Sequence, residues 1–464
     1  MKNKLIAIGA IAGALAVTAC DLDVPDLNNP AIDDLQSHPT ALSIGVATTG
    51  LLIGNRTTHG AENGYVSQLG IVGREAYCFD SADPRFVREL LEQVLNPGSP
   101  FGGNFWQFSY SNIRMANIIL SVVNNVEDLT AENKHAIIGF TKTIEALDLL
   151  RVISTHDTNG AVVDTNHAVT ETLPPIVDKD TTFAAIAKLL DDAVPELTMG
   201  GEAFPFLLDE GFSDFADPAS FITFNRAIRA RVAVYMKDYP HALAFIKDSF
   251  INDGSDPAKP LNLEAGADYT YTTKGGDATN GLATPNIFAH ASVIADAQAD
   301  DKRLTRKIVK AKQAGALRGL SSDQTFTMYA KPTSPIPLIH NKELILLRAE
   351  VEWLTPGATP ADKQKAIDDL NIVRVNDGGL PKITAIPADD AAFKTALLYE
   401  RRYSLLFEGH RLIDLRRFDR QSELPIEKAL NGNAHKLNIR WPIPLPECNA
   451  RGGTDEPRCA LGST

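Results

Sequence analysis

The sequence predicts a mainly α-helical protein in which helical hairpins form a curved scaffold and a second, irregular, loop-rich lobe packs on it. Three observations indicate this fold. Apolar residues recur three or four positions apart through several long segments. These segments come in neighbouring pairs joined by turns. Two long stretches between the pairs are rich in Gly, Asn, Asp and Pro and lack a helical period.

The clearest helical pair lies in the first half of the chain. Residues 104–123 place Trp106 and Tyr110 on one apolar face. Residues 131–153 repeat the pattern, and Thr130 precedes them in the manner of a helix N-terminus. We expect an antiparallel hairpin, and we assign Trp106 to packing.

Further helical stretches occupy residues 180–197, 221–250 and 341–376. Trp353 lies on an apolar face of the last stretch, so we assign it to packing as well. Small residues at helix crossings and tight turns resemble tetratricopeptide-type hairpins, each of which needs neighbours to bury its apolar face. The sequence therefore predicts a scaffold of several tetratricopeptide-like units.

The first residues are typical of a signal peptide. Lys2 and Lys4 precede an apolar run over residues 5–17, whose 13 residues are fewer than the about 20 that a spanning helix needs. Residues 17–20 then resemble a bacterial lipobox that ends in Cys20. We expect Cys20 to become a lipidated N-terminus that anchors the protein to a membrane. Plain secretory cleavage that leaves Cys20 unmodified is the alternative.

The composition is that of a globular protein, with 464 residues, 44% hydrophobic and 22% charged. A net charge of -13 would repel phosphate backbones, so we expect no nucleic-acid partner. The expected segments are a signal peptide at 1–19, a lipidated N-terminus and tether at 20–40, and one compact body at 41–464. Within the body, the helical lobe covers approximately 105–250 and 339–420, and loop-rich inserts cover approximately 50–104 and 251–338.

Three cysteines remain if Cys20 is lipidated. Cys448 and Cys459 are close in a Gly- and Pro-rich tail, where an oxidising compartment would allow a disulfide. Cys78 is then unpaired, and we expect a buried free thiol. No Cys or His spacing in the sequence fits zinc, so we expect no metal and no cofactor.

Charged residues crowd the last predicted helical region. Their helical spacings allow i,i+3 and i,i+4 ion pairs, which we expect to be structural. These residues are Glu400, Arg401, Glu408, Arg411, Asp414 and Arg417.

Four motifs in this region carry a family resemblance. They are NKELILLRAEV at 341–351, LNIVR at 370–374, YERRYSLLFEGHRLIDLRR at 399–417 and WPIPLPE at 441–447. Their order and content resemble the SusD/RagB family, and the resemblance, lipobox included, spans most of the mature chain. The chain departs from the family where His156 and Asp157 replace a Tyr-Gly turn and where Cys448 follows the last motif.

The resemblance implies a SusD-like fold and a non-catalytic function. Members bind oligosaccharides or other oligomeric nutrients at the cell surface and sit over a SusC-like TonB-dependent outer-membrane transporter. By resemblance, this chain would be lipid-anchored in the cell outer membrane, facing the exterior, and would deliver an oligomeric nutrient to such a transporter.

Two other classes of function stay open. A helical-repeat scaffold for protein interactions explains the repeats and the anchor. A lipoprotein glycoside hydrolase needs only a suitable pair of carboxylates. The sequence has no G-x-S-x-G, H-E-x-x-H or P-loop motif. His156 and Asp157 form its only close His–carboxylate pair, and their place at a helix end favours capping, so we expect no enzyme.

Ligand contacts are expected in the loops, because aromatic faces stack on sugars while Asp, Asn and Arg hydrogen-bond hydroxyl groups. The candidates are Tyr65, Arg74, Tyr77, Asp80, Asp83, Phe101 and Asn104, with Tyr271 and Tyr329 as secondary candidates.

Overall fold

The structure is a computed structural model that describes residues 32–167, 171–274, 277–453 and 456–464. The expected signal peptide at 1–19 and the expected lipidation site Cys20 lie outside the described residues. No helix in these ranges is long and apolar enough to cross a membrane.

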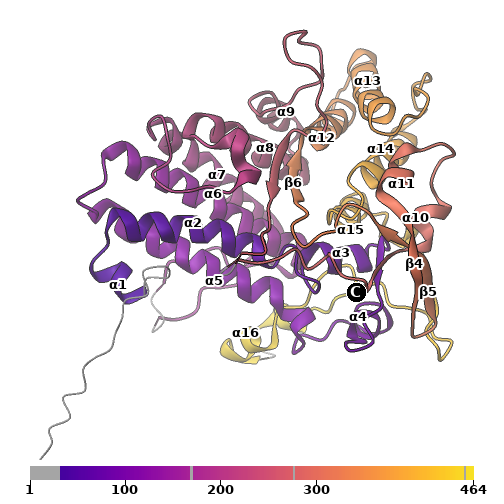
Figure 1. Cartoon of the computed structure of the whole chain (residues 1–464), viewed down its shortest axis with the longest axis horizontal. Helices are drawn as coiled ribbons and strands as arrows, with labels where there is room; N and C mark the ends of the chain where they lie inside the picture. The colour runs from indigo at the N-terminus through magenta and orange to yellow at the C-terminus, as the bar shows by residue number, and fades with distance from the viewer. Residues whose placement is uncertain (1–31, 168–170, 275–276, 454–455) are drawn as a thin grey trace, which may run out of the picture.

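Long helices dominate the structure and follow one another in a row from α2 to α14 (Figure 1). Each of them packs against the next one in the row, and α12 also packs against α14. The mainly α-helical prediction is confirmed. The helices of the row are α2 (Ala41–Thr57), α5 (Pro100–Val122), α6 (Ala131–His156), α7 (Lys179–Thr198), α8 (Pro218–Tyr235), α9 (Tyr239–Lys247), α12 (Asn341–Leu354), α13 (Pro360–Asn376) and α14 (Asp390–Ser404).

Side-chain caps fix where several of these helices begin. Thr130 accepts a hydrogen bond from the Asn133 backbone N–H at 3.2 Å and starts α6, as its place in the sequence predicts. Asp217 and Thr359 form capping boxes at the starts of α8 and α13. The helical pairs predicted from periodicity therefore correspond to α5 with α6, α8 with α9 and α12 with α13.

The predicted loop-rich insert at 50–104 is more helical than expected. It holds the C-terminal part of α2, then α3 (Tyr65–Val72), α4 (Arg85–Val87) and η1 (Arg88–Glu92). Gly and Thr interrupt the apolar period of α2, but Thr40 and Ser43 form a capping box, and the helix packs on α5 and α6. Tertiary burial thus outweighs weak intrinsic helix propensity there.

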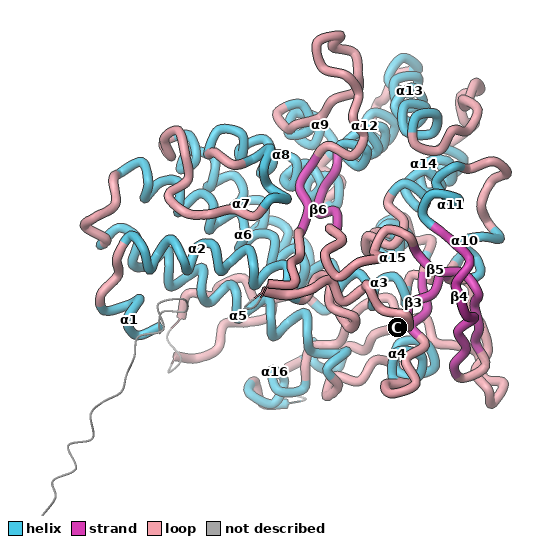
Figure 2. The backbone as a smooth tube through the Cα atoms, viewed as in Figure 1, coloured by secondary structure: helices cyan, strands magenta, loops and turns pink. Residues whose placement is uncertain are grey.

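Strands in the described part of the chain form two-stranded antiparallel sheets (Figure 2). In one pair Tyr77 faces Phe288, and in another a bulge follows Ala267. The pairs are β1 (Ala76–Cys78) with β3 (Ile287–Ala289), β2 (Gly266–Tyr269) with β6 (Ile336–His340), and β4 (Ile308–Leu317) with β5 (Leu320–Phe326).

Short helical turns complete the irregular part of the fold. They are α1 (Ile32–Ser37), η2 (Val123–Asn125), η3 (Asp157–Asn159), η4 (Glu210–Phe215), α10 (Ala291–Ala295), α11 (Lys302–Lys307), α15 (Arg411–Arg417), η5 (Gln421–Glu423), α16 (Leu445–Ala450) and η7 (Pro457–Ala460).

Aromatic packing joins the C-terminal segment to the helical row and also joins helices within the row. Trp441 is fully buried and meets Phe105 of α5 edge-on, with ring centroids 5.6 Å apart. Trp353 stacks on Phe393 at 4.3 Å, which joins α12 to α14 and confirms its packing role.

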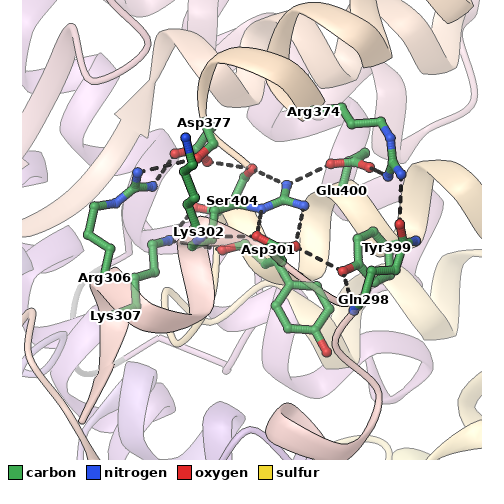
Figure 3. Close-up of polar contacts among 12 residues, drawn as sticks. Gln298, Asp301, Lys302, Arg306, Lys307, Arg374, Asp377, Tyr399, Glu400 and Ser404 are labelled. Atoms are coloured by element: carbon green, nitrogen blue, oxygen red, sulfur yellow. Dashed lines mark hydrogen bonds and ion pairs between the residues drawn. The ribbon is translucent and has the colours of Figure 1, made fainter. Parts of the chain in front are cut away.

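Buried ion pairs connect the last helices to the rest of the protein. Arg303 of α11 contacts Glu400 of α14 at 2.6 Å and Asp301 at 2.7 Å, and Arg374 of α13 contacts the other Glu400 oxygen at 2.7 Å (Figure 3). Ser404 joins the same cluster through Arg303 at 2.9 Å. The carboxylate of Glu400 therefore holds three elements together.

The expected short-range pairing in this region is only partly correct. Asp414 and Arg417 form an i,i+3 pair at 3.0 Å, but Arg401 pairs with Asp414 across two helices at 2.7 Å. Glu408 lies 3.7 Å or more from its nearest ammonium groups. Arg411 makes no ion pair within 4.0 Å to any residue that the structure describes. The chain bends between α14 and α15, so helical spacing does not continue from one to the other.

Candidate functional site

A cleft of about 810 Å³ opens beside the N-terminal half of α5, within the usual size of small-ligand sites. Residues from 162–167 and 171–174 form another wall, and the segment around α16 closes one end. Its lining includes Ser99, Gly103, Asn104, Trp106, Gln107, Tyr110, Ser111, Arg114, Val162, Asp164, Thr165, His167, Glu171, Leu173, Pro444, Glu447 and Arg451.

One face of α5 supplies a row of polar side chains to this cleft. Asn104, Gln107, Ser111 and Arg114 are three or four residues apart, so they lie on the same side of the helix. At 1.5 Å per residue, the row extends for about 15 Å along the cleft. Ser99 caps the helix through the Phe101 backbone N–H and sets where this row begins. The arrangement offers hydrogen bonds to an elongated ligand.

Aromatic side chains form the inner part of the cleft. The rings of Trp106 and Tyr110 lie 4.8 Å apart, and Trp106 is only 5% exposed. The Tyr110 hydroxyl donates to the Val162 carbonyl at 2.8 Å and accepts from the Val162 N–H at 2.6 Å. Burial raises the pKa of Tyr110 far above its ordinary value, so the hydroxyl stays protonated. The Tyr110 contacts fix this other wall against α5.

The wall from 162–167 and 171–174 carries an exposed cluster of acidic groups around one histidine. Asn117 holds Thr165 through side-chain and backbone contacts at 3.0 Å. His167 lies 2.8 Å from Asp164 and 2.9 Å from Glu171. The hydrogen bond that His167 donates to Asp164, followed by the one to Glu171, raises the pKa of His167. The histidine thus partly offsets two negative charges at the rim.

The α16 end of the cleft is cross-linked. Cys448 and Cys459 form the disulfide that the sequence suggested, with Cα atoms 5.8 Å apart. Arg451 pairs with Glu447 at 2.7 Å and donates to the Pro174 carbonyl. These contacts hold α16 against the residues that enter the cleft wall. Cys78 is a buried free thiol, as expected.

The structure distributes the sequence-predicted ligand residues over several places. Asn104 lines the cleft. Tyr65 lies in a separate crevice inside the protein. Asp80 accepts from the Ala82 backbone N–H at 2.8 Å, and Asp83 pairs with Arg85 at 2.7 Å. Neither aspartate lines the cleft.

Arg74, Tyr77 and Phe101 are core residues, which corrects their selection as surface ligand contacts. Each is at most 1% exposed, so none can reach a ligand in this conformation. Arg74 donates to backbone carbonyls that include those of Ile71 and Val72, and the Tyr77 hydroxyl donates to Glu427 at 2.6 Å. Aromatic residues in loop-rich sequence are here the core of the irregular lobe.

The secondary candidates Tyr271 and Tyr329 are buried as well, at 6% and 4% exposure. The Tyr329 hydroxyl donates to the Phe407 carbonyl at 3.1 Å, and the Tyr271 hydroxyl lies 3.4 Å from the Arg56 carbonyl. Both hydroxyls therefore support the core.

Gln107, Ser111 and Arg114 are cleft residues that the sequence analysis missed. The apolar face of 104–123 predicts the helix, and these residues continue from Asn104 at helical spacing on its polar face. The wall from 162–167 and 171–174 gives no comparable signal, because only the fold brings it beside α5.

His156 and Asp157 have structural contacts. His156 Nδ1 lies 2.9 Å from the Val152 carbonyl, and Asp157 lies 2.6 Å from Lys179 and 3.3 Å from Arg416. Asp157 ends α6 with a positive φ of 49°. The pair thus connects the end of α6 to α7 and α15.

The row of helices, the short-stranded lobe and the cleft between distant segments define a helical-scaffold binding fold. Residues 295–442 match the sequence model of the SusD family. No curated protein matches the sequence. The resemblance seen in the sequence is thus confirmed in this segment, and solved structures extend the fold to most of the chain.

Three solved structures illustrate the likeness. A SusD superfamily protein from Bacteroides vulgatus has a TM-score of 0.66 and 16% identity, covering 89% of this chain and 97% of that one. Surface glycan-binding protein A from Bacteroides thetaiotaomicron has a TM-score of 0.67 and 14% identity, covering 91% and 98%. The same glycan-binding protein in complex with laminarihexaose has a TM-score of 0.65 and 15% identity, covering 90% and 98%. The chain has the SusD fold.

Proposed function

We propose that this protein binds an oligosaccharide, or another oligomeric nutrient, in the cleft beside α5. The polar row from Asn104 to Arg114 carries the proposal, because a line of hydrogen-bonding side chains along a cleft suits an elongated, hydroxyl-rich ligand. The complex of a structural neighbour with laminarihexaose supports the ligand class.

The protein would act at the cell surface and pass its ligand to a SusC-like TonB-dependent outer-membrane transporter. Lipidation at Cys20 would hold it in the outer membrane with its body facing the exterior. The lipobox at 17–20 and the family match at 295–442 support this assignment.

The function would be capture without bond cleavage. Asp164 and Glu171 are both paired with His167, and Glu447 is paired with Arg451. Carboxylates that are already engaged by partners within the protein suit a structural role. A protein-interaction scaffold and a glycoside hydrolase are the alternatives that experiments should separate.

A pair of substitutions on α5 tests the binding site. We expect Asn104→Ala with Gln107→Ala to weaken binding at least tenfold, because two hydrogen bonds to the ligand are worth about 1 kcal/mol each. Isothermal titration with a glycan panel that begins with laminarihexaose measures this. Gln364→Ala on exposed α13 is the matched control and should bind as the wild type does. Equal affinity in all variants would remove the cleft as the site, and glycan cleavage would favour a hydrolase.

A pull-down from solubilised membranes of the native host tests the partner. The full-length protein should retain a large outer-membrane barrel with a TonB-dependent plug. The Cys20→Ala variant should leave the membrane fraction if Cys20 carries the anchor. Recovery of only soluble or inner-membrane proteins would favour the interaction scaffold.

A further inference from the structure

A second, smaller cavity lies in the middle of the protein and shares no residue with the cleft. It has a volume of about 50 Å³, which exceeds the roughly 10–15 Å³ that one water molecule needs. Helices α6 and α8, strands β2 and β6, and the turn before α15 contribute to its lining. Its lining consists of His59, Tyr65, Leu147, Leu150, Arg151, Ser154, Arg231, Tyr235, Tyr269, Pro337, Leu338, Glu408 and His410. We call it the His59 crevice.

His59 faces this crevice without a partner in the protein. His59 is only 6% exposed, and neither ring nitrogen has a hydrogen-bond partner. The ring lies between Tyr65, with centroids 5.1 Å apart, and Tyr269, with centroids 4.7 Å apart. The two aromatic rings fix the imidazole, and a neutral imidazole must donate one N–H. A buried donor without an acceptor is costly, so the geometry calls for an acceptor inside the crevice.

Arg231 provides a second donor group among the lining residues. Its Nε and Nη2 atoms contact the two Glu343 oxygens at 2.7 Å and 2.6 Å, and Nη2 also donates to the Leu338 carbonyl at 2.7 Å. No hydrogen bond to a described residue engages its Nη1. One corner of a buried guanidinium therefore stays available to a group in the crevice.

The surroundings of the imidazole are electropositive. Burial is the main reason that the pKa of His59 is lowered, and Arg151, His410 and Arg231 lower it further. Arg151 itself is weakly held, with contacts of 3.3 Å to Thr58 and Asn55 and 3.5 Å to Asp148. Burial raises the pKa of Asp148 to about 6. At mildly acidic pH its carboxylate therefore neutralises less of the positive charge of Arg151.

Glu408 is the acidic residue in the lining and must be weighed against these cations. Its carboxylate lies 3.7 Å from the Lys307 ammonium group and 3.8 Å from that of Lys342. Two ammonium groups therefore face one carboxylate on that side. Glu343 is likewise engaged by Arg231, and lies 3.8 Å from His410. Neither carboxylate accepts a hydrogen bond from the free N–H group of His59.

We propose that the His59 crevice binds a small inorganic anion of the halide class, held by His59 and by Nη1 of Arg231 and flanked by Arg151. The ion would accept hydrogen bonds from donors that the protein leaves unpaired. It would connect α6, α8 and the turn before α15 at the centre of the fold.

Bromide diffraction tests the proposal directly. Crystals of the wild-type protein soaked in sodium bromide should show an anomalous peak inside the crevice, at hydrogen-bond distance from His59 and Arg231. Water density in the crevice, with bromide at surface positions only, would overturn the proposal. This outcome would leave the proposed glycan site untouched, because the two cavities share no residue.

Thermal unfolding supplies a solution test. At equal ionic strength, the wild type should melt roughly 1–2 °C higher in chloride than in gluconate, with saturation as chloride rises. His59→Phe should abolish the difference, whereas the control His241→Phe, at an exposed position of α9, should keep it. The proposal is rejected if the wild type melts at the same temperature in both salts and the crevice in the bromide crystals is empty or filled with water. This outcome does not depend on whether His59→Phe folds.

Discussion

Arg303 and Glu400 form an ion pair of 2.6 Å inside the protein, where their side chains are 0% and 1% exposed. Loss of one partner would leave a buried charge without compensation. We expect Arg303→Met to lower the free energy of unfolding by about 3–5 kcal/mol. Urea denaturation followed by circular dichroism measures this loss.

Lys310→Met is the surface control for that experiment. Lys310 is 77% exposed and lies 3.8 Å from Asp323. A pair of this kind contributes less than about 1 kcal/mol. A loss of similar, small size for both variants would contradict the structural importance of the buried cluster.

The helices were predictable where apolar period and caps agree. Thr130 marks the start of α6, and regular apolar spacing follows it to the end of the helix. Helix α2 was missed because residues such as Gly45, Thr48 and Gly54 interrupt its apolar pattern. Its helical state depends on packing against α5 and α6, which the local sequence does not encode.

The candidate site was predictable only in part. Asn104 was selected, and the spacing to Gln107 and Arg114 could have extended the selection along the helix. The sequence predicts Tyr77 as a ligand contact because aromatic residues in loop-rich sequence can be exposed. They can equally be buried, and sequence alone does not distinguish the two. The wall around Asp164 comes from a segment that only tertiary structure brings beside α5.

His340 should make stability depend on pH. Burial alone would lower its pKa, but hydrogen bonds with Asp268 at 3.0 Å and Glu264 at 3.2 Å raise the pKa from 6.5 to about 9. The folded protein therefore binds this proton more tightly than the unfolded chain. The stabilisation is complete below about pH 6.5 and is lost as pH rises through about 9.

We expect this effect to be at most about 3 kcal/mol, because each pKa unit is worth 1.36 kcal/mol and Glu264 is 56% exposed and partly screened. Unfolding free energies of the wild type and of His340→Gln at pH 6, 8 and 10 measure it. The gap between the two proteins should shrink toward pH 10. A gap that stays constant from pH 6 to pH 10 would refute the assignment.

Tyr77 should affect stability and not ligand binding. Its side chain is 1% exposed, and its hydroxyl donates to Glu427 at 2.6 Å. We expect Tyr77→Ala to cost about 3–5 kcal/mol of unfolding free energy, as for other large core side chains. Asp80→Ala removes only a turn contact and should cost about 1 kcal/mol.

Ligand binding is checked by titrating the folded fraction of each variant with laminarihexaose or with the best ligand of the panel. Both variants should bind with the affinity of the wild type. Weaker binding by Asp80→Ala at unchanged melting temperature would return that residue to the candidate ligand contacts.

The Cys448–Cys459 disulfide should affect both stability and the cleft. It closes a short loop with a sequence separation of 11, for which chain entropy predicts roughly 3 kcal/mol. Glu447 and Arg451 of this segment line the cleft, so freedom of α16 would disorder one end of the site. We expect the double variant Cys448→Ala with Cys459→Ala to melt at lower temperature and to bind the ligand several-fold more weakly. Cys78→Ala, which removes a buried free thiol away from the cleft, should lower the melting temperature without changing affinity. Full affinity in the double variant would show that the ligand occupies the α5 end of the cleft and does not reach α16.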